Sequence, residues 1–159
     1  MTKEYFQDFM PGNACFGCGA ENPDGLQIKS YWDGDEAVCV WESKPRYHGW
    51  ENVINGGVLA TLIDCHCMDT AMAAALREEN RPLGSEPHYR YATATISVRY
   101  IKPTRNDRPI ELRAQVVEMK GRKTRLTCQV SVDGEKTAEA EALGVRVFEG
   151  QAEDGSLFR

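Results

Sequence analysis

The stretch that decides the fold of this chain covers residues 47–75 and reads YHGWENVINGGVLATLIDCHCMDTAMAAA. From Gly57 onward its residues are almost all apolar or small, which predicts a long helix that is buried on nearly every side. The clear polar interruptions are Asp64, His66 and Asp69. An ionised carboxylate inside a buried helix is costly unless it is paired. Asp64 is therefore a candidate for a residue that is kept for its chemistry.

The first turn of this helix is equally informative. Asn55 is a favoured N-cap residue, and Gly56 and Gly57 follow it. The amides of a first turn have no partner within the helix and lie at the positive end of its dipole. Because glycines leave these amides accessible, we expect an oxyanion site for acyl transfer here, with Asp64 two turns further along. The same helical stripe carries two residues expected to contact substrate, Thr61 and Met68.

The rest of the chain predicts six strands. Alternating apolar residues and turn residues predict a hairpin before the helix and four strands after it. The expected ranges are 26–31 and 37–42, then the helix at 56–77, then 91–101, 110–119, 124–132 and 136–148. Two strands, a helix and four strands form an α+β order. Small residues alternate from Ala138 to Gly144, which leaves room for the helix against an antiparallel sheet.

The segment HGWENVINGGVLATLID resembles the signature of the hotdog-fold acyl-CoA thioesterases, in the branch of the phenylacetate-pathway and THEM-type enzymes. There the segment reads roughly H-x-G-x-x-x-x-H-G-G-x-x-A-T-L-x-D. The resemblance extends to CFGCGAENPDGLQIK (15–29), SVRYIKPT (97–104) and MKGRKT (119–124). One departure is Asn55, which replaces the family histidine and cannot carry a proton as histidine does.

This resemblance implies a hotdog fold, in which a six-stranded antiparallel sheet wraps a long central helix. The hotdog domain is expected at 26–150, after an N-terminal segment at 1–25 and before a C-terminal tail at 151–159. The implied reaction is hydrolysis of an acyl-CoA, or a related acyl thioester, to the free acid and thiol. The implied assembly is a homodimer or a dimer of dimers.

The resemblance also implies roles for single residues. Asp64 acts from the opposing subunit, as general base or as nucleophile. Thr93, placed by counting back from SVRYIKP, orients the attacking water. The residues alone show Thr93, Thr95 and Ser97 on one strand face, which is equally typical of hydroxyls facing solvent. The family loop near the thioester corresponds here to His48 and Gly49. No metal or redox cofactor is implied, because coenzyme A is part of the substrate.

The charge pattern favours a small anionic ligand. The chain carries a net charge of −5, yet residues 99–125 hold nine basic and three acidic residues. This local excess suits the phosphates of coenzyme A better than nucleic acid, which the overall charge opposes. The alternative is that these are solvated strand positions. The residues expected to bind the phosphates are Lys102, Arg105, Arg122 and Lys123.

The cysteines and the N-terminus bear on compartment and cofactors. The first ten residues lack a continuous apolar region, and two aspartates and a histidine interrupt the apolar helix, so we expect a cytoplasmic protein outside the membrane. The six cysteines are then expected to stay reduced. Cys15 and Cys18 form a CxxC motif, but a structural zinc site needs four ligands and no second such pair is present. A compact turn is the favoured interpretation, ahead of zinc or redox chemistry.

Other functions remain open. His66 lies on a different helix face from Asp64, which favours a core or interface histidine over a general base. A non-catalytic acyl-CoA-binding hotdog protein is the main alternative to the enzyme, and a purely structural dimer is another. A hotdog hydratase is disfavoured because the motif lacks a histidine at the start of the helix.

Overall fold

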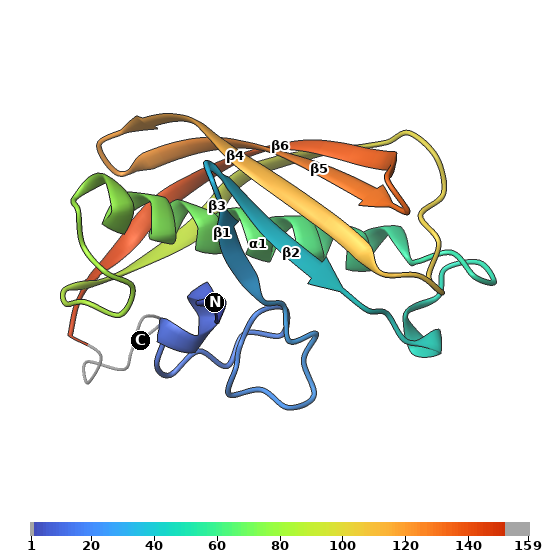
Figure 1. Cartoon of the computed structure of the whole chain (residues 1–159), viewed down its shortest axis with the longest axis horizontal. Helices are drawn as coiled ribbons and strands as arrows, with labels where there is room; N and C mark the ends of the chain where they lie inside the picture. The colour runs from blue at the N-terminus through green and yellow to red at the C-terminus, as the bar shows by residue number, and fades with distance from the viewer. Residues whose placement is uncertain (1, 152–159) are drawn as a thin grey trace.

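The computed structural model describes residues 2–151, so most of the predicted tail (152–159) lies outside the described residues. One long helix packs against a six-stranded antiparallel sheet, which confirms the predicted α+β fold (Figure 1). The strands are β1 (Ser30–Asp33), β2 (Glu36–Trp41), β3 (His88–Tyr100), β4 (Ile110–Lys120), β5 (Lys123–Val132) and β6 (Glu135–Gly150). The helices are η1 (Phe6–Phe9) and η2 (Pro45–Tyr47), both 3₁₀, and α1 (Gly56–Glu78).

The sheet order is β1-β2-β4-β5-β6-β3, with every neighbouring pair antiparallel. The 13-residue β3 forms one edge and the 4-residue β1 the other. The first strand begins at Ser30 instead of residue 26. The preceding residues pair with the cysteine turn instead, since the amides of Leu26 and Ile28 donate to the carbonyls of Phe16 (2.8 Å) and Gly17 (3.1 Å).

The helix α1 lies across the concave side of the sheet, with the N-terminal segment against its opposite side (Figure 1). By length and composition it could span a membrane, but 78% of its most apolar stretch is buried inside this fold. The alternating small residues of β6 face it, as predicted: Ala138 and Ala142 are buried, and Met68 packs on Gly144. The apolar character of α1 is therefore accounted for by the core.

A buried polar network joins η1 to α1. The Nε2 of Gln7 donates to Oδ2 of Asp69 (2.7 Å) and to Oγ of Ser30 (3.2 Å). The imidazole of His66 pairs through Nδ1 with Oγ of Ser30 (2.8 Å) and through Nε2 with the carbonyl of Ala37 (3.0 Å). Each of these side chains is fully or almost fully buried. The network therefore fastens the N-terminal segment to the helix.

Burial shifts the ionisation of both titratable members of this network. It lowers the pKa of His66 to about 4, so the ring is neutral near pH 7 and serves as a hydrogen-bonding core residue. It raises the pKa of Asp69 to about 7, against the opposing effect of the hydrogen bond from Gln7. The fully buried carboxylate of α1 is therefore Asp69, whereas Asp64 is only partly buried.

Candidate active site

The start of α1 has the capped geometry that the sequence predicts. Oδ1 of Asn55 accepts hydrogen bonds from the amides of Gly57 (2.8 Å) and Val58 (3.2 Å). The Gly57 amide, one of the two expected oxyanion donors, is thus already paired with the cap. Within residues 2–151, neither the Gly56 amide nor Nδ2 of Asn55 donates a hydrogen bond. Asn55, Gly56 and Gly57 are all exposed, so these two donors are accessible to a ligand.

Tyr100 is a residue of this site that the sequence reasoning missed. It ends β3, and its hydroxyl donates to the carbonyl of Gly56 (2.7 Å). Tyr100 is 51% exposed, so this contact lies at the surface of the chain. Its position in the SVRYIKPT segment was a usable signal, but contact with the helix start required the fold.

Asp64 lies on the one stripe of α1 that this chain leaves uncovered. Gly57 is exposed, and Ala60, Thr61 and Asp64 are partly buried, whereas every residue from Cys65 to Leu76 is buried. The hydroxyl of Thr93 donates a hydrogen bond to Oδ1 of Asp64. The structure therefore brings together the carboxylate and the hydroxyl that the resemblance paired.

A β-bulge is what turns Thr93 toward the helix. Thr93 pairs with Gly144 and Thr95 pairs with Leu143, so Ala94 is an extra residue in β3. An extra residue reverses which face the following side chains occupy. Thr93 consequently faces α1, as do Ile96 and the residues in phase with it beyond the bulge. The predicted sharing of one face by Thr93, Thr95 and Ser97 is wrong, because simple alternation cannot reveal a bulge.

The two halves of the predicted machinery do not meet within one chain. Asp64 is eight residues beyond Gly56 on the same helix, which corresponds to about 12 Å along the axis at 1.5 Å per residue. Reacting groups must approach to about 3–3.5 Å. A carbonyl held at the Gly56 amide is therefore out of reach of the Asp64 carboxylate of the same chain.

The predicted substrate contacts occupy different environments. His48 is partly buried and lines a cavity of about 340 Å³ with Asn106 and Arg108, away from Asp64. Gly49 approaches the helix start closely, because a side chain there would lie 3.2 Å from Cα of Asn55. The other two predicted substrate contacts differ in exposure. Thr61 lies on the uncovered stripe of α1, whereas Met68 is buried in the core.

The basic residues separate into two groups. Lys102 and Arg105 follow β3 near the start of α1, where they pair with Glu135 and Asp107. Arg122 lies in the β4–β5 turn and Lys123 is the first residue of β5. Lys123 pairs with Val145 of β6, which in turn pairs with Ala92 of β3. Figure 1 shows these two regions at opposite ends of the sheet. One chain therefore does not gather the four predicted phosphate ligands into a single patch.

Comparison with known proteins assigns this chain to a family. The sequence profile of the thioesterase superfamily matches residues 51–139. Acyl-coenzyme A thioesterase THEM4 of Bos taurus is 26% identical over 129 residues, covering 80% of this chain and 48% of that protein. The chain thus spans about half the length of this curated relative.

Solved structures agree on the hotdog fold. A thioesterase superfamily protein from Shewanella loihica PV-4 is 29% identical, with a TM-score of 0.62 over 74% of this chain and 89% of that one. The E. coli PaaI protein from the phenylacetic acid degradation operon has a TM-score of 0.63 at 12% identity, over 79% and 83% of the two chains. Because the profile match covers more than half of the chain, this protein belongs to the thioesterase superfamily.

Proposed function

We propose that this protein hydrolyses acyl-CoA thioesters at a site built from two copies of the chain. The observation that carries the proposal is the Asp64 carboxylate, which accepts from Thr93 on the uncovered stripe of α1. Membership of the thioesterase superfamily supports the reaction class. The Bos taurus relative is named an acyl-coenzyme A thioesterase, and a fold neighbour from Streptococcus pneumoniae was solved with coenzyme A.

In this proposal the thioester carbonyl lies at the start of α1. The Gly56 amide donates to its oxygen, and Nδ2 of Asn55 donates beside it, because Oδ1 of the same planar amide is committed to the cap. The Gly57 amide can donate to the same carbonyl oxygen only if its hydrogen bond to Oδ1 of Asn55 breaks. Donors aimed at an oxygen that becomes negative stabilise the transition state for acyl transfer.

Asp64 of the second chain then supplies the base. It takes a proton from water as the water oxygen bonds to the carbonyl carbon, while Thr93 holds the carboxylate in place. The tetrahedral intermediate collapses by breaking its carbon–sulfur bond, and the proton on Asp64 passes to the departing thiolate. Direct attack by the carboxylate, followed by hydrolysis of the anhydride, uses the same geometry. Neither path requires a metal or redox cofactor.

The requirement for a second chain follows from the distance between Asp64 and Gly56. It is also favoured by β3, which is a long edge strand with unpaired backbone groups on one side. Such an edge is a template for pairing with another chain. In a two-fold assembly each chain contributes to both sites. The separated basic groups, Lys102 with Arg105 and Arg122 with Lys123, would then reach the phosphates of coenzyme A from different chains.

The test is thiol release from short, medium, long and aryl acyl-CoAs, with Asp64→Asn beside the wild type. We expect turnover by the wild type and a loss of about 10²-fold or more in the variant, the range for a positioned acid–base group. Glu78→Gln, an exposed carboxylate on the same helix, is the matched control and should keep full activity. Controls without substrate are needed, because the exposed thiol of Cys15 would itself contribute to the thiol signal.

Two results would overturn the mechanism. If Asp64→Asn hydrolysed substrate as fast as the wild type, the Asp64 carboxylate would have no part in the mechanism. Saturable binding of acyl-CoA without turnover of any substrate would instead identify a non-catalytic acyl-CoA-binding protein.

A further inference from the structure

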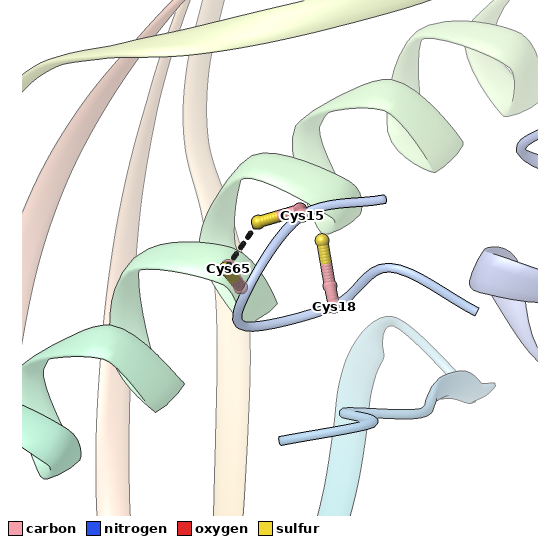
Figure 2. A group of neighbouring side chains, drawn as sticks. All are labelled: Cys15, Cys18 and Cys65. Carbon is pink, nitrogen blue, oxygen red and sulfur yellow. Dashed lines mark hydrogen bonds between the residues drawn. The ribbon is translucent and has the colours of Figure 1, made fainter. Parts of the chain in front are cut away.

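Three cysteines that are far apart in the sequence meet beside α1. Cys15 and Cys18 lie on the turn of the N-terminal segment, and Cys65 projects toward them from the helix (Figure 2). Their three sulfur atoms all lie within 4.8 Å of one another. Cys18 and Cys65 are buried, while Cys15 is exposed. The thioester hydrolysis proposed above uses none of them.

The spacing of the sulfur atoms matches metal coordination. Cys15 Sγ and Cys65 Sγ are 3.8 Å apart. Two thiolates of a tetrahedral zinc site, each about 2.3 Å from the metal, are separated by about 3.8 Å. A disulfide requires about 2.0 Å instead. The sulfur atoms of Cys15 and Cys65 are thus already at the separation that a shared zinc ion would impose, and Cys18 Sγ lies within 4.8 Å of both.

The turn that carries the first two thiols places hydrogen-bond donors beside both sulfur atoms. The amide of Gly17 donates to Cys15 Sγ (3.3 Å), and the amide of Gly19 donates to the carbonyl of Cys15 (2.9 Å). The side chain of Asn13 donates to Cys18 Sγ (3.5 Å). Donors of this kind orient thiolate ligands and offset their negative charge.

Close packing of this turn on α1 depends on a glycine. A Cβ at Gly17 would lie 2.3 Å from Cys65 Sγ and 3.2 Å from Cγ2 of Thr61. Any side chain there would push the turn away from the helix. The third sulfur therefore joins the CxxC pair only because position 17 has no side chain.

We propose that Cys15, Cys18 and Cys65 bind one zinc ion that fastens the N-terminal segment to α1. Three thiolates favour a thiophilic metal, and zinc accepts tetrahedral sulfur sites without redox chemistry. A water molecule would complete the tetrahedron as the fourth ligand, because the described residues place only these three side chains at the cluster. The sequence shows a single CxxC pair, and it cannot show that a cysteine of the helix lies beside that turn.

The first measurement is the metal content of the full chain. The protein should be purified without a metal-affinity step, under a non-chelating reductant, and analysed by plasma mass spectrometry. We expect about one zinc per chain, the stoichiometry of a single mononuclear site. Zinc should be lost in Cys15→Ser, Cys18→Ser, Cys65→Ser and Gly17→Ala. It should be retained in Cys128→Ala, which removes a buried cysteine outside the cluster.

A second measurement begins with the wild type, so its first result does not depend on a variant folding. Wild-type protein, stripped with a chelator and kept reduced, is titrated with Co²⁺ and then with Zn²⁺. We expect one equivalent of cobalt to give a thiolate-to-cobalt charge-transfer band that zinc abolishes. Folded Cys65→Ser should bind zinc at least about 100-fold more weakly, since even outer-shell changes cost 10- to 100-fold.

Three results would overturn the zinc assignment. One is reduced wild-type protein that takes up neither metal. Another is full zinc content in Cys65→Ser. The third is a disulfide between Cys15 and Cys18 or Cys65, detected as an intact mass lower by two hydrogens and located by peptide mapping, which would make the cluster a redox pair.

Discussion

At the scale of single residues, the planar amide of Asn55 combines two tasks that a variant can separate. Oδ1 caps α1, and Nδ2 is the proposed donor to the thioester carbonyl. Asn55→Asp keeps a capping oxygen but loses the donor, so we expect kcat to fall by about 10²–10³-fold. Its unfolding free energy should stay near that of the wild type, because aspartate caps as well as asparagine. Steady-state kinetics and denaturant unfolding measure the two effects.

Asn55→Ala is the matched comparison for this prediction. It removes the cap as well, which costs about 1 kcal/mol of stability. Full activity in Asn55→Asp would show that Nδ2 does not contact the carbonyl.

Thr93 provides a second residue-level prediction. Its hydroxyl donates to the Asp64 carboxylate, and hydrogen bonds to charged groups contribute about 1.5–3 kcal/mol. Thr93→Val preserves shape but removes the donor, so we expect kcat to fall by about tenfold to a hundredfold. Thr93→Ser keeps a hydroxyl and should retain most of the activity. Equal activity in both variants would mean that the hydrogen bond does not serve the reaction.

At the scale of elements, the docking of η1 on α1 depends on Gln7. Gln7→Leu would leave Oδ2 of Asp69 and the amide of Ser30 without their partner while keeping similar volume. An unsatisfied buried polar group costs about 1–3 kcal/mol, so the variant should be destabilised by at least that amount. Denaturant unfolding at fixed protein and zinc concentrations measures the loss. Gln129→Leu, at an exposed position of β5, should change stability by less than about 0.5 kcal/mol.

At the scale of the whole molecule, the proposed two-chain site can be tested by mixing inactive variants. Asp64→Asn lacks the base and Asn55→Asp lacks the donor, so each homodimer has two defective sites. A mixed dimer would hold one intact site if Asp64 acts across the interface. Refolding the two variants together in equal amounts should then restore about a quarter of wild-type activity, because each chain contributes to both sites of a two-fold dimer. No recovery would place all catalytic groups of a site in one chain.

Much of the fold was readable from local signals. The N-cap at Asn55, the two glycines and the apolar run defined α1 at its observed start, because capping and periodicity act within a few residues. The four strands after α1 followed from alternation, with ends that moved by only a few residues. The first strand was misplaced because residues 26–28 pair with the distant cysteine turn rather than with β2.

The candidate site was only partly readable. Resemblance paired Asp64 with Thr93, but the β-bulge at Ala94 that orients Thr93 leaves no mark in the alternation. Both aspartates of α1 were expected to be buried, but only Asp69 is, because Gln7, about 60 residues away in the chain, covers it. Such a contact belongs to tertiary packing and leaves no mark in helix periodicity.

The sequence by itself determined the long apolar helix, its capped start, the antiparallel α+β order and the family, because each depends on residues close together in the chain or on a recognisable motif. Only the tertiary structure decided which face of α1 stays uncovered, that Tyr100 reaches Gly56, and that Cys65 joins Cys15 and Cys18. These features arise where distant segments pack together, and a pattern along one segment carries no information about what will lie against it.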